Sequence, residues 1–406
     1  MKRGFGFWLA AIVAAGVALR VVHTLLVAPW PPGFFNDEAY YQAMAELIAR
    51  GEGFVRPGEF LGEGISIPTA ERPPLYPIAL AGLVELGADG EDPMRLLGAL
   101  TGGATIALLG LLGRRLAGPS AGLIAAGLAA VYPTLIAADG ALMTESLYGM
   151  LAALALLLAQ RLLDEGGNGR AALLGAVVGL AALARGEALI LLPLLLIPLL
   201  RRPGGLKAAA VACLAFVLVL TPWTIRNWSA FDRPVLVATE GGQTIAGANC
   251  EATYNGHLIG SWQVSCVRLE GHDNEAVDNN EAAREGIEYA VDHAERVPLV
   301  LAARVARTWG LFWPGQVPEG RADWVVYLGV GMYVLLLPLA AYGLVTLRRR
   351  GVAVAVVAAP LVVVTLASLV SYGSVRFRHT AELALVVLAA VAIDRLWRRR
   401  AGEEPA

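Results

Sequence analysis

Long apolar runs alternate with short polar segments along most of the chain. A helix needs about twenty apolar residues to cross the hydrocarbon core of a membrane. The pattern predicts about ten such spans, near residues 7–28, 93–113, 119–138, 142–163, 171–184, 188–200, 206–224, 324–347, 352–371 and 379–397. We therefore expect an all-α polytopic membrane protein.

Two apolar segments can be read either as one membrane span or as something shorter. The run Leu75–Leu86 is too short to cross and predicts a juxtamembrane helix at the outer surface. A single helix over residues 171–200 would bury Arg185 and Glu187 near mid-membrane, which is costly. Two short helices that turn at these residues fit better, with Arg185 and Glu187 as an ion pair. The first run lacks a convincing cleavage site, so we expect a retained helix rather than a signal peptide.

Charge is sorted along the chain, although the net charge of −2 is small. Of the 406 residues, 57% are hydrophobic and 16% charged, against roughly a quarter charged in soluble domains. Residues 30–92 hold three Arg against eleven Asp or Glu, and residues 226–323 hold eight against fourteen. The segments expected inside carry basic residues: Lys2, Arg3, Arg114, Arg115, Arg161, Arg170, Arg201, Arg202, Lys207, Arg348, Arg349, Arg350, Arg395, Arg398, Arg399 and Arg400. By the positive-inside rule both long loops are extracytoplasmic and both termini cytoplasmic in the plasma membrane.

Three parts follow from this topology. Residues 1–225 form an N-terminal transmembrane module with a first outer loop at 30–92. Residues 226–323 form a larger outer loop or small domain, and residues 324–406 form the C-terminal helices with a basic tail.

The second loop contains two helical patterns and two cysteines. Ala276–Arg296 is charged, whereas Pro298–Phe312 is more apolar and is expected to lie on the membrane. Cys250 and Cys266 are expected to pair in an oxidising space, and two free thiols are the alternative. Cys213 falls within a span.

Acidic residues stand directly after the first span. Asp37 and Glu38 lie at its mouth, where a membrane enzyme needs a base that faces both water and a lipid-borne substrate. Asn36 or Asp37 could equally cap an interfacial helix. Glu71 and Arg72 form a second charged pair shortly before the next apolar run.

The order of short motifs resembles a known superfamily. Asp37-Glu38 and Glu71-Arg72-Pro73-Pro74-Leu75-Tyr76-Pro77 are followed by Thr144-Glu145-Ser146-Leu147, Pro222-Trp223-Thr224-Ile225-Arg226-Asn227 and Arg376-Phe377-Arg378. This series resembles the GT-C glycosyltransferases, in the branch of the protein O-mannosyltransferases and the lipid A aminoarabinose transferase. The resemblance implies a helical bundle whose first outer loop forms juxtamembrane helices. It also implies sugar transfer from a polyprenyl phosphate to a hydroxyl of a glycan, lipid or protein.

The resemblance also assigns roles to residues. It implies Asp37 as the catalytic base, with Glu38 beside it. Glu71 lines the site, and Arg72 lies near the lipid phosphate. Asp139 corresponds to an acidic residue at the outer end of the third span. A basic residue common after the acidic pair is replaced here by Ala39-Tyr40, which leaves the acceptor and part of the phosphate site open.

The reaction needs positive charge at the leaving phosphate, from arginine or a divalent cation. Arg72, Arg226, Arg376 and Arg378 are all predicted at the outer face, where simple snorkelling to the interface is the alternative. A metal could use His257 or His379 with Asp37, Glu38, Glu71 or Asp139, although no close His/Cys spacing marks a site. The absence of a nucleotide fingerprint favours a lipid-linked donor and no nucleic-acid partner.

Other functions remain open from the sequence. A lipid-linked sugar flippase or secondary transporter would favour paired halves and mid-membrane charges. A GT-C-like ligase for whole glycans is a second alternative. A purely structural membrane protein would leave the outer carboxylates unexplained.

Overall fold

The computed structural model describes residues 4–27, 37–268, 271–272, 274–312 and 323–402. These residues form eighteen α-helices and no β-strand, apart from one isolated bridge between Val55 and Pro68. The all-α prediction is confirmed.

A helix, or a helix pair, coincides with each predicted span. They are α1 (Phe5–Val22, continued by the π-turn His23–Val27), α5 (Glu91–Ala117), α6 (Pro119–Val131) with α7 (Pro133–Gly140), α8 (Glu145–Glu165), α9 (Asn168–Ala184), α10 (Ala188–Leu196), α11 (Gly205–Phe231), α16 (Asp323–Arg349), α17 (Val354–Val370) and α18 (His379–Arg400). The chain breaks between α9 and α10 at Arg185–Glu187, as predicted.

Five of these helices are long and apolar enough to cross a membrane: α1, α5, α8, α11 and α16. The pair α6 and α7, bent by 56°, makes a sixth if the two helices are counted as one span. Helices α9, α10 and α17 are shorter, and α18 carries Glu382 near its start and Asp394 near its end. Crossing by these last four helices stays a prediction.

Helix α18 lies at the centre of the bundle and packs against α5, α6, α8, α16 and α17. Nearly every residue from His379 to Asp394 is buried. Small residues let other helix pairs approach closely, as membrane bundles commonly do. A Cβ at Gly175 of α9 would come within 1.9 Å of the carbonyl oxygen of Ala212 on α11. The central position of α18 also fixes the turn Val375–Arg378 that leads into it.

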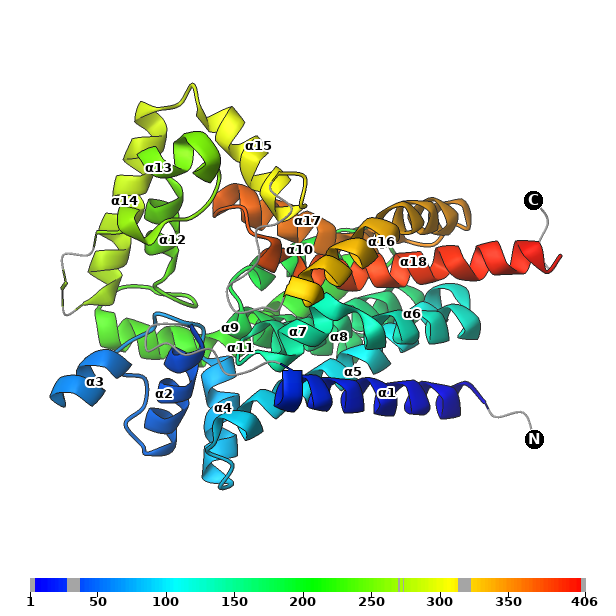
Figure 1. Ribbon diagram of the computed structural model, residues 1–406, viewed down its shortest axis with the longest axis horizontal. Coiled ribbons are helices and arrows are strands. Elements are labelled where there is room, and N and C mark those ends of the chain that lie inside the picture. Colours follow the sequence, from blue (N-terminus) through cyan, green and yellow to red (C-terminus); the bar gives the residue numbers. More distant parts are fainter. Residues whose placement is uncertain (1–3, 28–36, 269–270, 273, 313–322, 403–406) are drawn as a thin grey trace.

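The two loops form a layer at one end of the bundle, opposite both chain termini (Figure 1). The first contributes α2 (Asp37–Ala49), α3 (Pro57–Glu63) and α4 (Leu75–Glu85), and the second contributes α12 (Gly241–Ala248), α13 (Glu251–Tyr254), α14 (Glu275–Asp292) and α15 (Val297–Thr308). Helix α4 runs across the direction of the bundle (Figure 1), as expected of a juxtamembrane helix. The compartment that this layer faces stays a prediction.

The structure tests the predicted pairing of the cysteines. Cys250 and Cys266 form a disulfide with Cα atoms 6.2 Å apart, which confirms the predicted pair. Cys213 on α11 is free and exposed. Residues 30–36 and 313–322 of the predicted loops lie outside the described residues, as do the basic Lys2 and Arg3.

Candidate active site

Asp37 is the first residue of α2 and lies between two arginines. Arg72 Nη2 donates to its Oδ1 at 2.8 Å, and Arg376 Nη1 donates to its Oδ2 at 3.0 Å. All three side chains are 27% exposed, so the carboxylate is held on both oxygens yet remains within reach of a ligand.

The two arginines extend this contact into a row of alternating charges. Arg72 also contacts Glu240 and Glu71, and Arg376 also contacts Glu145. Glu145 pairs in turn with Arg185 at 3.0 Å, and Arg185 with Glu187 at 3.5 Å. We call these residues the Asp37 cluster: Asp37, Glu71, Arg72, Glu145, Arg185, Glu187, Glu240 and Arg376. With every group ionised, five negative and three positive charges give −2.

Helix ends and short turns deliver these side chains to one place. Asp37 and Glu145 occupy the first turns of α2 and α8, and Glu240 precedes α12. Arg376 belongs to the 3₁₀ turn Val375–Arg378 that leads into α18. Because α18 is fixed at the centre of the bundle, this turn carries Arg376 to the outer layer.

Each guanidinium next to Asp37 has one nitrogen without a strong hydrogen-bond acceptor among the described residues. Within the described part of the chain, Arg72 Nε is buried and donates no hydrogen bond, lying 3.6 Å from Glu71 Oε1. Arg376 Nη2 meets only the thioether sulfur of Met143, at 3.9 Å, and such a sulfur is a weak acceptor. Neither nitrogen has a strong acceptor at hydrogen-bond distance among the described residues.

The charges around Asp37 set its protonation. Burial alone would raise the pKa of Asp37, but Arg72 and Arg376 outweigh burial and hold the pKa below its ordinary value. Asp37 is therefore ionised at neutral pH. A ligand that draws the guanidiniums away from Asp37 would raise this pKa and make the carboxylate a stronger base.

The neighbouring acids behave in the opposite way. Burial, helped by the negative charges of Glu275, Glu240 and Asp37, raises the pKa of Glu71 to about 7 against the effect of Arg72. Burial also raises the pKa of Glu38. Glu71 is thus a second proton acceptor within the Asp37 cluster.

Two predicted carboxylates lie outside this cluster. Glu38 follows Asp37 on α2, and its Oε2 is buried without a hydrogen bond among the described residues. Asp139 lies in α7, where its Oδ2 accepts from Arg20 Nε of α1 at 2.6 Å, with side chains 5% and 1% exposed. The roles predicted for Glu38 and Asp139 stay predictions, but neither contacts Arg72 or Arg376 by an observed ion pair.

Two predicted arginines also have other partners. Arg226 lies on the end of α11 beyond the predicted span and donates to the carbonyl oxygens of Thr69 at 2.8 Å and Phe54 at 2.7 Å. Arg378 pairs with the buried Glu382 at 2.7 Å and lies 3.6 Å from the ring centroid of Tyr333. The structure thus brings Arg72 and Arg376 to Asp37, and uses Arg226 and Arg378 elsewhere.

Sequence reasoning gave no role to several residues of the cluster. Glu145 stood in a recognised motif and opens an apolar span, which is itself a signal because ionisable groups are rare there. Arg185 and Glu187 were expected only to pair with each other. Nothing in the sequence distinguished Glu240 as a site residue, since it is one of fourteen acids in its loop.

Among the described residues, neither His257 nor His379 forms a group of three possible metal ligands with the predicted acids. His257 lies in the second outer loop, where its carbonyl oxygen accepts from Arg307. His379 packs at the start of α18 against Gly149, where a Cβ would come within 2.6 Å of its Nε2. Arginines already occupy both oxygens of Asp37. A divalent metal at the Asp37 cluster stays a prediction.

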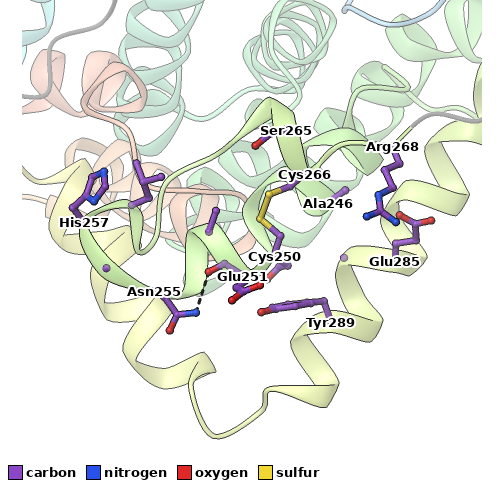
Figure 2. Close-up of a pocket in the computed structure, with 15 residues that line it drawn as sticks. Ala246, Cys250, Glu251, Asn255, His257, Ser265, Cys266, Arg268, Glu285 and Tyr289 are labelled. Atoms are coloured by element: carbon purple, nitrogen blue, oxygen red, sulfur yellow. Dashed lines mark hydrogen bonds between the residues drawn. A yellow bond between two sulfur atoms is a disulfide. The ribbon is translucent and has the colours of Figure 1, made fainter.

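A cleft of about 810 Å³ lies in the second loop, apart from the Asp37 cluster. Figure 2 shows Tyr289, Glu285 and Arg268 on one side of it and the Cys250–Cys266 disulfide on another. Helix α12 separates the two sites, because Glu240 precedes its first residue and Ala246 lines the cleft. These two residues are six positions apart, which is a rise of about 9 Å along a helix.

Comparison with known proteins adds a family match. Residues 71–225 match the model of the family described as dolichyl-phosphate-mannose-protein mannosyltransferase. The match begins at Glu71 and ends directly before Arg226, so it includes Arg72, Glu145, Arg185 and Glu187. No curated protein sequence matches the chain.

Solved structures share the fold at low sequence identity. The archaeal oligosaccharyltransferase AglB from Archaeoglobus fulgidus, in complex with an inhibitory peptide and a dolichol-phosphate, matches with a TM-score of 0.58 and 14% identity over 99% of this chain and 52% of AglB. AglB in complex with zinc and sulfate gives 0.57 and 15%, over 97% and 50%. ArnT from Cupriavidus metallidurans bound to undecaprenyl phosphate gives 0.45 and 16%, over 96% and 78%. The chain spans about half the length of AglB.

Proposed function

We propose that this chain, which has the GT-C fold predicted from its motifs, is a membrane glycosyltransferase. It takes a sugar from a polyprenyl-phosphate donor and transfers it to a hydroxyl of an acceptor. The family match and the dolichol-phosphate bound by AglB support a lipid-linked donor. The observation that carries the proposal is Asp37 held between Arg72 and Arg376.

The two arginines supply the phosphate site. Arg72 Nε and Arg376 Nη2 are the nitrogens without a strong acceptor among the described residues, and charge-assisted hydrogen bonds to phosphate oxygens are among the strongest available to a protein. Glu240, Glu71 and Glu145 orient the guanidiniums from the other side. These carboxylates fix the positions of both guanidiniums before a donor binds.

Donor binding and base activation are coupled in this arrangement. When the phosphate attracts Arg72 and Arg376, Asp37 loses part of the charge that depresses its pKa. Asp37 then accepts the proton of the acceptor hydroxyl, and the hydroxyl oxygen bonds to the anomeric carbon. The bond between that carbon and the phosphate oxygen breaks, and the phosphate leaves with the electron pair. Attack opposite the leaving phosphate inverts the anomeric centre.

The test is transfer by purified protein. Radiolabelled polyprenyl-phosphate sugars are incubated with the protein and with candidate glycan, lipid and protein acceptors, and both products are measured. Asp37-dependent release of polyprenyl phosphate together with labelled acceptor supports the proposal. Movement of intact donor across a vesicle membrane without bond cleavage would favour the flippase instead.

A further inference from the structure

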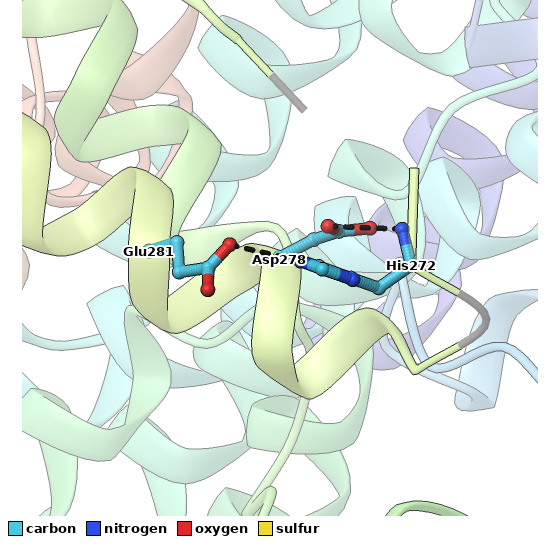
Figure 3. Close-up of side chains that lie close together, drawn as sticks. All are labelled: His272, Asp278 and Glu281. Atoms are coloured by element: carbon cyan, nitrogen blue, oxygen red, sulfur yellow. Dashed lines mark hydrogen bonds and ion pairs between the residues drawn. The ribbon is translucent and has the colours of Figure 1, made fainter. Parts of the chain in front are cut away.

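A second cluster of ionisable groups lies at the start of α14, outside the Asp37 cluster. Asp278 and Glu281 are three residues apart and so share a face of the helix. His272 precedes the helix, and its Nε2 lies 3.1 Å from Glu281 Oε2 (Figure 3). Its backbone N–H donates to Asp278 Oδ1 at 3.3 Å. One ligand atom from each of the three side chains lies within 4.8 Å of the others.

We propose that His272, Asp278 and Glu281 bind a Zn²⁺ ion, with water completing a tetrahedral site. An imidazole nitrogen with carboxylate oxygens is a donor set that zinc uses, at about 2.0–2.2 Å from the ion. Ligand atoms around such an ion are roughly 3.3 Å apart, and the His272–Glu281 separation already meets this value.

Two of the three side chains are exposed enough to move the short distance that an ion requires. The side chains of His272 and Glu281 are 40% and 48% exposed, so they can rotate toward an ion. Asp278 is only 7% exposed and supplies a fixed point. As a plain surface ion pair, His272–Glu281 would contribute little to stability. Asp278, on the same helix as Glu281, adds a third possible ligand to this pair.

An outer shell holds the histidine in place. Arg56 of the first loop donates from Nη2 to the carbonyl oxygen of His272 at 3.1 Å, and from Nε to Glu275 Oε1 at 3.2 Å. Arg56 therefore fixes the backbone of His272 relative to the first turn of α14. This contact fixes the backbone position from which the His272 imidazole would reach the ion.

All three ligands belong to the second loop, and Glu275, between His272 and Asp278, joins this part of the chain to the first loop. Glu275 Oε2 accepts from the backbone N–H of Ala70 at 2.9 Å and from the hydroxyl of Thr239 at 2.9 Å. These residues directly precede Glu71 and Glu240, two of the three carboxylates that contact Arg72. Zinc at the start of α14 would thus stiffen the segments that hold Arg72. The zinc site itself does not depend on the proposed transfer reaction.

The experiment uses the full chain in detergent, without a histidine tag and after treatment with a chelator. Zn²⁺ is titrated while bound metal is measured by mass spectrometry and the melting temperature by fluorescence. We expect one zinc per chain and a rise in melting temperature. His272→Ala and Glu281→Gln should each weaken binding by at least ~10-fold, since even outer-shell changes cost 10- to 100-fold.

His293→Ala is the matched control, because His293 is another histidine of the same loop and its Nδ1 lies 2.9 Å from the carbonyl oxygen of Tyr289, apart from the three proposed ligands. It should leave zinc affinity unchanged. Equal zinc affinity in the wild type, His272→Ala and Glu281→Gln would overturn the site, as would a lack of saturable binding. Glu281→Gln keeps the test valid if His272→Ala fails to fold, because Glu281 is exposed.

Discussion

Arg376 Nη1 donates to Asp37 Oδ2 at 3.0 Å, although 339 positions separate the two residues. The contact joins the first outer helix to the turn before the last helix of the bundle. Arg72 holds the other oxygen of Asp37. The acid and the two cations therefore form one unit, in which a change at any member alters the charge felt by the others.

Replacing Asp37 with Asn should slow transfer strongly, while the protein still binds the donor. The amide keeps the shape of the side chain but cannot accept the acceptor's proton. Loss of a general base costs about 100- to 10,000-fold in rate, so kcat should fall by this factor in assays with a radiolabelled donor.

Glu63→Gln provides the control for that variant, because Glu63 is an exposed acid at the end of α3. It should retain wild-type kcat. Near-normal turnover by Asp37→Asn would instead make Glu71, Glu38 or Asp139 the base. If none of the four carboxylates affects transfer, the flippase becomes the better account.

The arginines should separate into two classes. Arg72→Ala and Arg376→Ala remove nitrogens that face the proposed phosphate, and each should raise the KM for the donor about 10-fold or more, since a hydrogen bond to a charged group contributes about 1.5–3 kcal/mol. Arg226→Ala removes donors to Thr69 and Phe54. It should lower the melting temperature and leave donor KM near the wild-type value. A donor KM unchanged in Arg72→Ala and Arg376→Ala would contradict the phosphate site.

The pH profile should distinguish Asp37 from Glu71 as the base. The arginines hold the pKa of Asp37 below its ordinary value, so this base stays ionised at neutral and mildly acidic pH. We expect kcat/KM to remain level as pH falls through 7. If Glu71 were the base, kcat/KM would fall about tenfold per unit below its pKa of about 7.

Glu71 should also contribute to the pH dependence of stability. Its pKa rises from 4.5 to about 7 in the folded chain, so folding favours its protonated form. Its contribution is fully present below pH 4.5 and is lost as pH rises through about 7. Glu71→Gln should flatten this part of the plot of melting temperature against pH. An unchanged plot would show that Glu71 is not protonated on folding.

The helices were predictable because a membrane demands long apolar runs. Part of the site was predictable for a related reason, since charges at the mouth of a span are few and easily noticed. Asp37, Glu71 and Arg72 were found in this way. Motif order added Arg376, which lies far from them in sequence.

A predicted position at the membrane surface did not show which partner each charged side chain contacts. Arg226 and Arg378 lie at the expected level, but α11 continues outward past Arg226, and Arg378 points toward Glu382 within its own helix. Glu240 reaches Arg72 only through the folding of the second loop. Such contacts depend on packing between distant segments, which apolar periodicity does not encode.

The layer of loops should face the outside of the cell. The basic residues at the other end of the bundle predict this orientation. Ser229→Cys on the exposed end of α11, in a background that lacks Cys213, should react with an impermeant maleimide in intact cells. Arg348→Cys at the opposite end should react only after lysis. The reverse pattern would invert the topology and move the Asp37 cluster to the cytoplasmic face.

Arg20 and Asp139 should act as a structural pair within the bundle. Their side chains are 1% and 5% exposed, with Nε and Oδ2 2.6 Å apart. Arg20 also donates to the carbonyl oxygens of Ala129 and Ala130. Gly102 leaves room for the pair, since a Cβ there would come within 2.2 Å of Asp139 Oδ2. Both charges of this pair are therefore compensated by groups of the bundle.

Removing one partner leaves the other buried and uncompensated, which typically costs about 3–5 kcal/mol. Arg20→Met and Asp139→Leu should each lower the melting temperature, and the double variant should recover much of the loss. A double-mutant cycle measures this coupling. Asp139→Asn separates structure from chemistry. Reduced stability with normal kcat per folded molecule supports the structural role, whereas a 100-fold lower kcat at unchanged stability would make Asp139 the catalytic base.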